Sequence, residues 1–269
     1  MKYKLIASDF DNTIYDGHAV SPRVLAAITA YRRAGGRFVV ATGRIYESIR
    51  KKMPLIDADD ELIACQGAAL YSASTGEVYA RFPLSPEVAR TAVEYFESIG
   101  AVCHGYADRE FYVEKKNPYS DWYAAYCETN PTYLGYPLSR FLPEMEATNK
   151  VISILPEDEI DGRMIELREI LGGSAEVTKS APMFLEVTSS QAGKGNCLVA
   201  LAERLGIPME ETVAVGDNLN DLSMILAAGI GASVGNSVPG LIEHADLVLP
   251  PITEDGVAVL LERAIADEL

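Results

Sequence analysis

Cysteine and histidine are scarce in this chain, and neither is spaced as in metal or disulfide motifs. The chain has four cysteines and three histidines among its 269 residues. No C-x-x-C pair occurs, so the spacing of the cysteines indicates reduced thiols and argues against a disulfide framework or a zinc site. The histidines are isolated, which argues against a metal site built from imidazoles. These residues are Cys65, Cys103, Cys127, Cys197, His18, His104 and His244.

Positive charge is also in short supply. Lysine and arginine number 23 against 39 aspartate and glutamate residues, which gives a formal net charge of −16. A negative field of this size repels a phosphate backbone, so the composition disfavours nucleic-acid binding. It would also repel an anionic substrate unless a bound cation reversed the local sign, which is an indication of a metal ion.

Long apolar runs are lacking as well. No run approaches the ~18 apolar residues of a membrane-spanning helix, so we expect no membrane partner. The N-terminal residues lack the long apolar region of a signal peptide, and we therefore expect a cytoplasmic protein. The 48% of hydrophobic residues supply a proper core, and the length predicts one large or two modest domains.

The most informative stretch is near the start of the chain. Leu5–Ala7 are apolar without a break, which predicts a buried parallel strand, and the run ends in Asp9 and Asp11. If strand geometry persists, both carboxylates point to one face, where two charges roughly 4 Å apart repel by about 4 kcal/mol at an effective dielectric of ~20. A proton or a cation such as Mg²⁺ would relieve this repulsion. The alternative is a turn or helix cap without chemistry.

Two more predicted strands end in polar residues. Residues 37–41 run into Thr42-Gly43-Arg44, and residues 212–215 run into Gly216-Asp217. Thr42 alone is explained equally well as a helix cap. The strand–helix–strand order predicts parallel pairing, however, and ligands of open α/β sheets bind outside the carboxyl ends of the strands. The three polar strand ends together therefore predict a functional site.

The pattern between the two ends of the chain predicts a separate domain. From about Leu84 strands and helices follow in an α+β order, with many aromatic residues, and doubly wound patterning resumes near Gly193. We predict an α/β fold, with a doubly wound, Rossmann-like parallel-sheet core formed by residues 1–83 and 189–269. An α+β cap domain of residues 84–188 is inserted into this core.

Four motifs in order resemble those of the haloacid dehalogenase superfamily of phosphohydrolases. Asp9-Phe10-Asp11-Asn12-Thr13 matches the D-x-D-x-T motif, and Thr42-Gly43-Arg44 matches the second motif. Lys194 in Gly193-Lys194-Gly195 matches the third, and residues 216–221 match the fourth. The position of the insert, after the second motif, is similar to the Cof-type subfamily with a large type II cap.

The resemblance implies a Mg²⁺-dependent phosphatase that acts on a small phosphorylated metabolite. Asp9 would attack phosphorus and form an aspartyl phosphate, while Asp11 would protonate the leaving oxygen and then activate water. The implied metal ligands are Asp9, the main-chain carbonyl of Asp11, Asp217 and Asp221. The implied phosphate-site residues are Thr42, Gly43, Lys194 and Asn220. Sugar phosphates are the expected substrates, and nucleotide or pyridoxal phosphates are the next candidates.

Two departures from the family pattern stand out. Asn12 occupies a position that is often glycine, although asparagine tolerates left-handed backbone dihedrals. Gln66-Gly67-Ala68 stands where relatives often have Asn-Gly-Ala, which leaves the role of Gln66 open. Two alternative functions also stay open: a phosphotransferase or mutase that uses the same aspartyl phosphate, and a non-catalytic phosphate-binding module.

Overall fold

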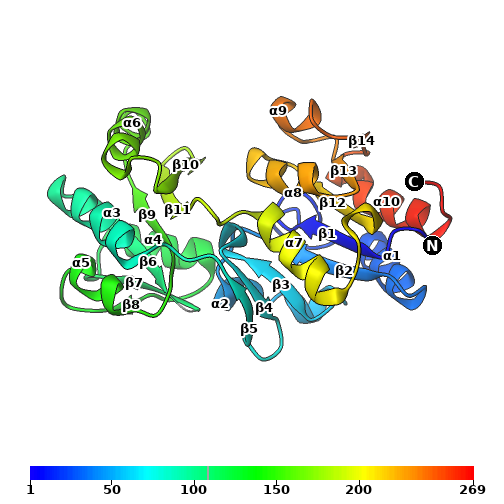
Figure 1. Ribbon diagram of the computed structural model, residues 1–269, viewed down its shortest axis with the longest axis horizontal. Coiled ribbons are helices and arrows are strands. Elements are labelled where there is room, and N and C mark those ends of the chain that lie inside the picture. Colours follow the sequence, from blue (N-terminus) through cyan, green and yellow to red (C-terminus); the bar gives the residue numbers. More distant parts are fainter. Residues whose placement is uncertain (108) are drawn as a thin grey trace. The chain divides into compact units, whose positions relative to one another are not determined.

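The computed structural model describes residues 1–107 and 109–269, which fall into two units (Figure 1). The core unit comprises Met1–Gly43, Ile49–Ala80 and Gly193–Leu269, and the cap unit comprises Arg44–Ser48 and Arg81–Ala192. The cap unit includes Arg44–Ser48, which the sequence placed in the core, and the division with boundaries after residues 83 and 188 stays a prediction. Among the described residues, no helix is both long enough and apolar enough to span a membrane.

The core unit is built on an eight-stranded sheet with the order β14-β13-β12-β1-β2-β3-β4-β5. Its strands are β1 (Leu5–Asp9), β2 (Arg37–Ala41), β3 (Glu61–Ala64), β4 (Ala69–Ser72), β5 (Val78–Arg81), β12 (Thr212–Gly216), β13 (Ile230–Ser233) and β14 (Leu247–Val248). Its helices are α1 (Pro22–Arg33), α7 (Lys194–Leu205), α8 (Leu222–Ala227), α9 (Pro239–Ile242) and α10 (Gly256–Ile265), while α2 (Tyr46–Ile49) crosses the boundary between the units. β1 pairs in parallel with both β2 and β12. The α/β fold predicted from the sequence is therefore confirmed.

The direction of the strand connections changes beside β1. The chain steps from β1 to β2 on one side and from β12 to β13 on the other. Right-handed crossovers in opposite directions place α1 and α8 on opposite faces of the sheet. α10 packs against α1, and α7 packs against α8. Because ligands of such sheets bind where the strand order reverses, the carboxyl ends of β1 and β12 are the expected place for a site.

The sequence explains where α1 starts and how it packs on the sheet. The Ser21 hydroxyl accepts a hydrogen bond from the Val24 amide, and Pro22 occupies the first turn of α1. Tyr31, on the buried face of α1, donates its hydroxyl hydrogen to the Tyr3 carbonyl at 2.9 Å. The ring of Tyr31 also lies so close to Gly36 that a Cβ there would be 2.3 Å from it. Tyr31 thus fixes α1 to the segments that lead into β1 and β2.

The cap unit contains a six-stranded, mostly antiparallel sheet with the order β10-β11-β9-β6-β7-β8. Its strands are β6 (Val102–Ala107), β7 (Glu110–Val113), β8 (Thr132–Tyr133), β9 (Thr148–Ile154), β10 (Ala175–Ala181) and β11 (Phe184–Ser189). Its helices are α3 (Pro86–Ser98), α4 (Pro118–Cys127), α5 (Leu138–Phe141) and α6 (Ile160–Leu171).

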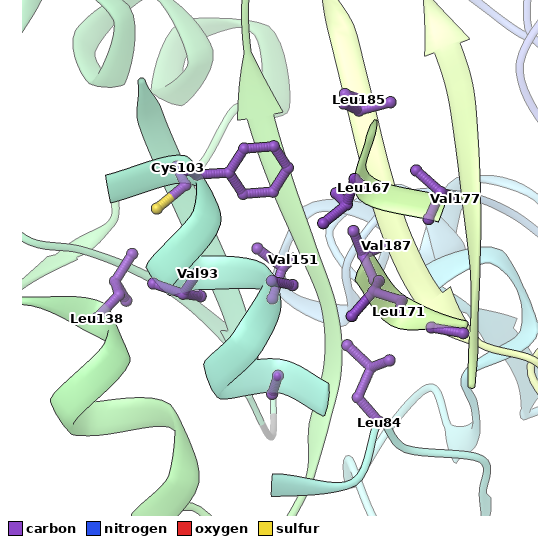
Figure 2. Close-up of a cluster of buried hydrophobic side chains, with 14 of the residues drawn as sticks. Leu84, Val93, Cys103, Leu138, Val151, Leu167, Leu171, Val177, Leu185 and Val187 are labelled. Atoms are coloured by element: carbon purple, nitrogen blue, oxygen red, sulfur yellow. The ribbon is translucent and has the colours of Figure 1, made fainter. Parts of the chain in front are cut away.

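One face of the cap sheet forms an apolar core with α3 and α6. Val151 on β9 and Val187 on β11 meet Val93 of α3 and Leu167 of α6, as Figure 2 shows. Successive side chains of a strand point to opposite faces, so the residues next to these in sequence lie on the other side of the sheet.

That other face carries a buried polar group of residues. Lys150 and Glu186 form an ion pair of 3.2 Å with side chains only 3% and 5% exposed. His104 on β6 is fully buried beside the ring of Tyr123 from α4, with the ring centroids 4.8 Å apart. Within the described part of the chain, neither ring nitrogen of His104 has a hydrogen-bond partner. Burial, assisted by the positive charge of Lys150, lowers the pKa of His104 to about 3.

We expect His104 to make the cap unit sensitive to acid. Below the usual histidine pKa of about 6.5 the unfolded chain binds a proton that the folded chain excludes, so stability falls as the pH falls toward 3. Between pH 7 and pH 5 this cost is about 2 kcal/mol, and His104→Phe should remove it. Urea unfolding followed by the fluorescence of the single tryptophan, Trp122 in α4, measures the effect.

His244→Phe is the matched control, because His244 is exposed and should leave the pH dependence as it is in the unmodified chain. Equal losses of stability in the unmodified chain and in His104→Phe would contradict the assignment of the acid sensitivity to His104.

Candidate active site

The carboxyl ends of three neighbouring strands bring the predicted site residues together. Asp9, the last residue of β1, is in register with Ala41 of β2, and Ser8 is in register with Val215 of β12. Thr42 and Asp217 follow these partners by one and two residues, so both lie next to Asp9 at the same edge of the sheet. This is the edge at which the strand order reverses.

Lys194, the first residue of α7, connects this edge to the turn after β12. Its ammonium group donates to Asp9 Oδ1 at 2.5 Å and to Asp221 Oδ1 at 2.5 Å. The side chains of Lys194 and Asp221 are fully buried, and that of Asp9 is 7% exposed. A buried charge is tolerated only when it is paired and hydrogen-bonded, and each of these three charges meets that condition.

Asp221 organises the turn that follows β12. Its Oδ2 accepts hydrogen bonds from the amides of Asp217 and Asn218, at 3.0 and 3.1 Å. This places the carboxylate against Gly216, where an added Cβ would lie 2.3 Å from Oδ2. Glycine at position 216 is thus required for Asp221 to reach both Lys194 and the turn.

Thr13 contributes a contact to which the sequence analysis gave no role. Its hydroxyl oxygen lies 3.3 Å from Asp9 Oδ2 and 3.3 Å from Asp217 Oδ1. The position of Thr13 in the first motif was the signal that could have pointed to it. The Thr13 hydroxyl therefore connects Asp217 to Oδ2 of Asp9, whereas Lys194 contacts Oδ1 of Asp9.

Burial and mutual repulsion shift the pKa values of the clustered acids. Burial and the nearby Asp221 carboxylate raise the pKa of Asp9 above its usual value, against the opposing effect of Lys194. Burial and Asp221 also raise the pKa of Asp217, to about 6. Burial alone would lower the pKa of Lys194, but Asp221 and Asp9 raise it above its usual value. The site therefore favours additional positive charge.

The remaining predicted residues lie around this cluster. Asp11 follows β1 in a half-buried turn in which Asn12 has a left-handed φ of 58°. The backbone of Asp11 bridges to Tyr15, and its carboxylate is separate from the group formed by Asp9, Asp217 and Asp221. Asn220 donates its side-chain N–H to Gln66 Oε1 at 3.0 Å.

The second motif, Thr42-Gly43-Arg44, directly follows the carboxyl end of β2. Thr42 is buried, and its amide donates to the Ile63 carbonyl at 2.8 Å. Gly43 lies directly beneath the side chain of Gln66, where a Cβ would be 2.6 Å from Gln66 Nε2. Gln66 is thus a second residue of this site to which the sequence assigned no role.

The donor set fits a hard divalent cation. Asp9, Asp217 and Asp221 each offer a carboxylate oxygen, and these oxygens lie within 4.8 Å of one another. Carboxylate oxygens are the ligands that Mg²⁺ prefers, and a bound cation would offset both the burial and the Asp221 charge that raise the pKa of Asp217. The cluster could therefore bind a divalent metal ion.

Comparison with known proteins identifies the family. Residues 6–261 match the family model of haloacid dehalogenase-like hydrolases. The Bacillus subtilis protein YxeH is 29% identical over 98% of both chains, and an HMP-PP phosphatase of Cronobacter sakazakii is 29% identical over 89% of this chain and 86% of its own.

Solved structures agree with this identification. A Thermotoga maritima protein superposes with a TM-score of 0.86 at 28% identity, covering 97% of both chains. The subclass IIB sugar phosphatase BT4131 superposes with a TM-score of 0.81 at 21% identity, covering 97% of this chain and 99% of its own, and at that identity the likeness concerns the fold. This chain belongs to the haloacid dehalogenase-like hydrolases, and the predicted enzyme class, a phosphatase of that family, is confirmed.

We expect the Lys194 contacts to stabilise the core unit strongly. Lys194→Met removes the cation and leaves the buried charges of Asp9 and Asp221 without an ion-pair partner, which should lower the free energy of unfolding by about 3–5 kcal/mol. Urea unfolding followed by circular dichroism measures the loss.

Lys4→Met is the matched control. The Lys4–Glu211 ion pair is also short, at 2.7 Å, but the Lys4 side chain is 54% exposed. Its loss should cost less than about 1 kcal/mol. If Lys194→Met were no more destabilising than Lys4→Met, the buried pairs would not hold the site together.

Proposed function

We propose that this chain is a Mg²⁺-dependent phosphomonoester hydrolase that acts on a small phosphorylated metabolite through an aspartyl-phosphate intermediate. The observation that carries the proposal is the position of Asp9, at the reversal of the strand order. Lys194 contacts one of its carboxylate oxygens, and the Thr13 hydroxyl connects the other to Asp217. One oxygen is thereby placed beside a cation that attracts a phosphoryl group, and the other beside a second acid suited to a metal ion.

In the first step, Asp9 Oδ1 attacks phosphorus and the bond from phosphorus to the ester oxygen breaks. The ester oxygen receives the proton of Asp11, so that it leaves as an alcohol. The ammonium of Lys194, the Thr42 hydroxyl and the backbone near Gly43 provide the fixed positive charge and donors that the transferring phosphoryl oxygens require.

In the second step, Asp11 takes a proton from a water molecule while the water oxygen attacks phosphorus. The bond between phosphorus and Asp9 breaks, which releases inorganic phosphate and restores both carboxyl groups to their starting forms. Asp11 suits this exchange because it lies two residues beyond Asp9 in a half-buried turn.

Asp9, Asp217 and the main-chain carbonyl of Asp11 would hold Mg²⁺. When bound, the ion neutralises the phosphoryl and carboxylate charges, which the net charge of −16 makes necessary for an anionic substrate. Asp221 completes the acidic cluster, but both of its oxygens already accept hydrogen bonds. This favours a role for Asp221 beside the ion, in which it holds Lys194 and Asp217 in place.

Sugar phosphates are the substrate class that we favour. Trp122 and Tyr126 of α4 are 48% and 60% exposed and stack with their ring centroids 5.8 Å apart. Exposed aromatic faces of this kind suit contact with a sugar ring. Hydrolysis of a panel of sugar, nucleotide and pyridoxal phosphates, followed by phosphate release, would test this choice.

Asp9→Asn should abolish phosphate release from an aryl phosphate, because an amide cannot act as the nucleophile. We expect kcat to fall by at least about 1,000-fold. Asp16→Asn is the matched control in the same loop, since Asp16 is exposed and asparagine keeps the oxygen that accepts from the amides of residues 18 and 19. Near-normal turnover by Asp9→Asn would exclude Asp9 as the nucleophile.

Removal of divalent metal should also abolish turnover, and Mg²⁺ should restore it. Loss of an outer-shell partner typically weakens metal affinity 10–100-fold, so Asp217→Asn, which removes the negative charge of a proposed direct ligand, should raise the Mg²⁺ concentration for half-maximal activity by about tenfold or more. A magnesium titration of the chelated enzyme measures both effects. Full activity after exhaustive chelation would show that no metal is needed.

A further inference from the structure

The turn after β3 has an unusual backbone. Cys65, Gln66 and Gly67 have φ values of 53°, 60° and 81°, so three consecutive residues occupy the left-handed region. Glycine adopts it freely, but cysteine and glutamine do not. Strained backbone of this kind persists where the surroundings hold it in place, and it is concentrated at functional sites.

The surroundings of this turn are the predicted phosphate-binding segments. The Gln66 amide donates to the Thr42 carbonyl at 3.2 Å. Gly67 packs against the start of α7 so closely that a Cβ would lie 2.2 Å from the Gly193 carbonyl carbon and 2.5 Å from the Lys194 nitrogen. The turn therefore joins the backbone of the second motif to that of the third.

The Gln66 side chain extends the connection to the fourth motif. Its Oε1 accepts the hydrogen bond from Asn220 Nδ2 at 3.0 Å. This contact turns the other end of the carboxamide, Nε2, toward Gly43, and a Cβ at Gly43 would lie only 2.6 Å from it. Among the described residues Nε2 has no hydrogen-bond partner, so its N–H groups remain available beside the Thr42-Gly43 segment.

We propose that Gln66 is a phosphate-binding residue. Its carboxamide oxygen positions Asn220, and its Nε2–H donates a hydrogen bond to an oxygen of the bound phosphoryl group. The left-handed turn is the means by which the chain brings this amide over Gly43. The inference rests on the proposed function, and it adds a donor to the set formed by Thr42, Gly43 and Lys194.

Gln66→Gly separates this role from a purely structural one. Glycine relieves the positive φ, so the thermal stability should be unchanged or higher. Loss of a hydrogen bond to a charged group should weaken the binding of inorganic phosphate by about tenfold or more. The affinity is measured by calorimetry with Mg²⁺ present, and as a competitive inhibition constant with an aryl phosphate as substrate. A residue that only supports the fold would give the opposite result, lower stability with unchanged phosphate affinity.

Gln66→Glu and Glu128→Gly complete the experiment. Gln66→Glu keeps the length of the side chain and the oxygen that accepts from Asn220, but it replaces the N–H donor with negative charge, so it should weaken phosphate binding more than Gln66→Gly does. Glu128, at the C-terminal end of α4, also has a positive φ, of 55°, and its replacement by glycine should leave phosphate affinity unchanged.

The outcomes distinguish this inference from the proposed function. If the unmodified chain hydrolyses the aryl phosphate while both Gln66 variants bind phosphate as it does, only the role of Gln66 is overturned. If the unmodified chain neither hydrolyses the ester nor binds phosphate, the proposed function fails and the role of Gln66 fails with it. If Gln66→Gly does not fold, Gln66→Glu decides the question.

Discussion

A fully buried lysine lies between two aspartates, and the rest of the site depends on this contact. Lys194 is 185 residues from Asp9 along the chain, and its ammonium joins the end of β1 to the turn after β12. Without that cation, the acids that approach one another here would be strongly destabilised by burial and mutual repulsion. In the proposed mechanism the same ammonium group also attracts the phosphoryl oxygens toward Asp9.

Small residues let the segments approach closely enough to make these contacts. Gly216 leaves room for the Asp221 carboxylate, and Gly195 brings α7 within reach of α8, since a Cβ there would lie 2.3 Å from the Ser223 carbonyl oxygen. Gly67 lies equally close to Gly193. Close backbone packing around a few charged side chains therefore stabilises this edge of the sheet, and it also positions the groups of the proposed active site.

The sequence was sufficient for the parts that follow from periodicity and strand order. Parallel strands end at one edge, so Asp9, Thr42 and Asp217 could be placed together before their contacts were known. The left-handed turn at Gln66 could not, because neither cysteine nor glutamine signals a positive φ. The contacts of Thr13 with two acids depend on side-chain directions that residue spacing does not specify. The aromatic stretch that forms α4 and α5 lacks a clear helical period, so residue spacing alone does not predict these two helices.

The stereochemical course at phosphorus tests most directly whether Asp9 carries the phosphoryl group. The substrate is a phosphorothioate monoester made chiral at phosphorus with two oxygen isotopes. It is hydrolysed in water that carries the third isotope, so the released thiophosphate is chiral and its configuration can be determined. Each in-line displacement inverts the configuration, so transfer first to Asp9 and then to water predicts overall retention. Overall inversion would show that water attacks the substrate directly, and it would contradict the role given to Asp9.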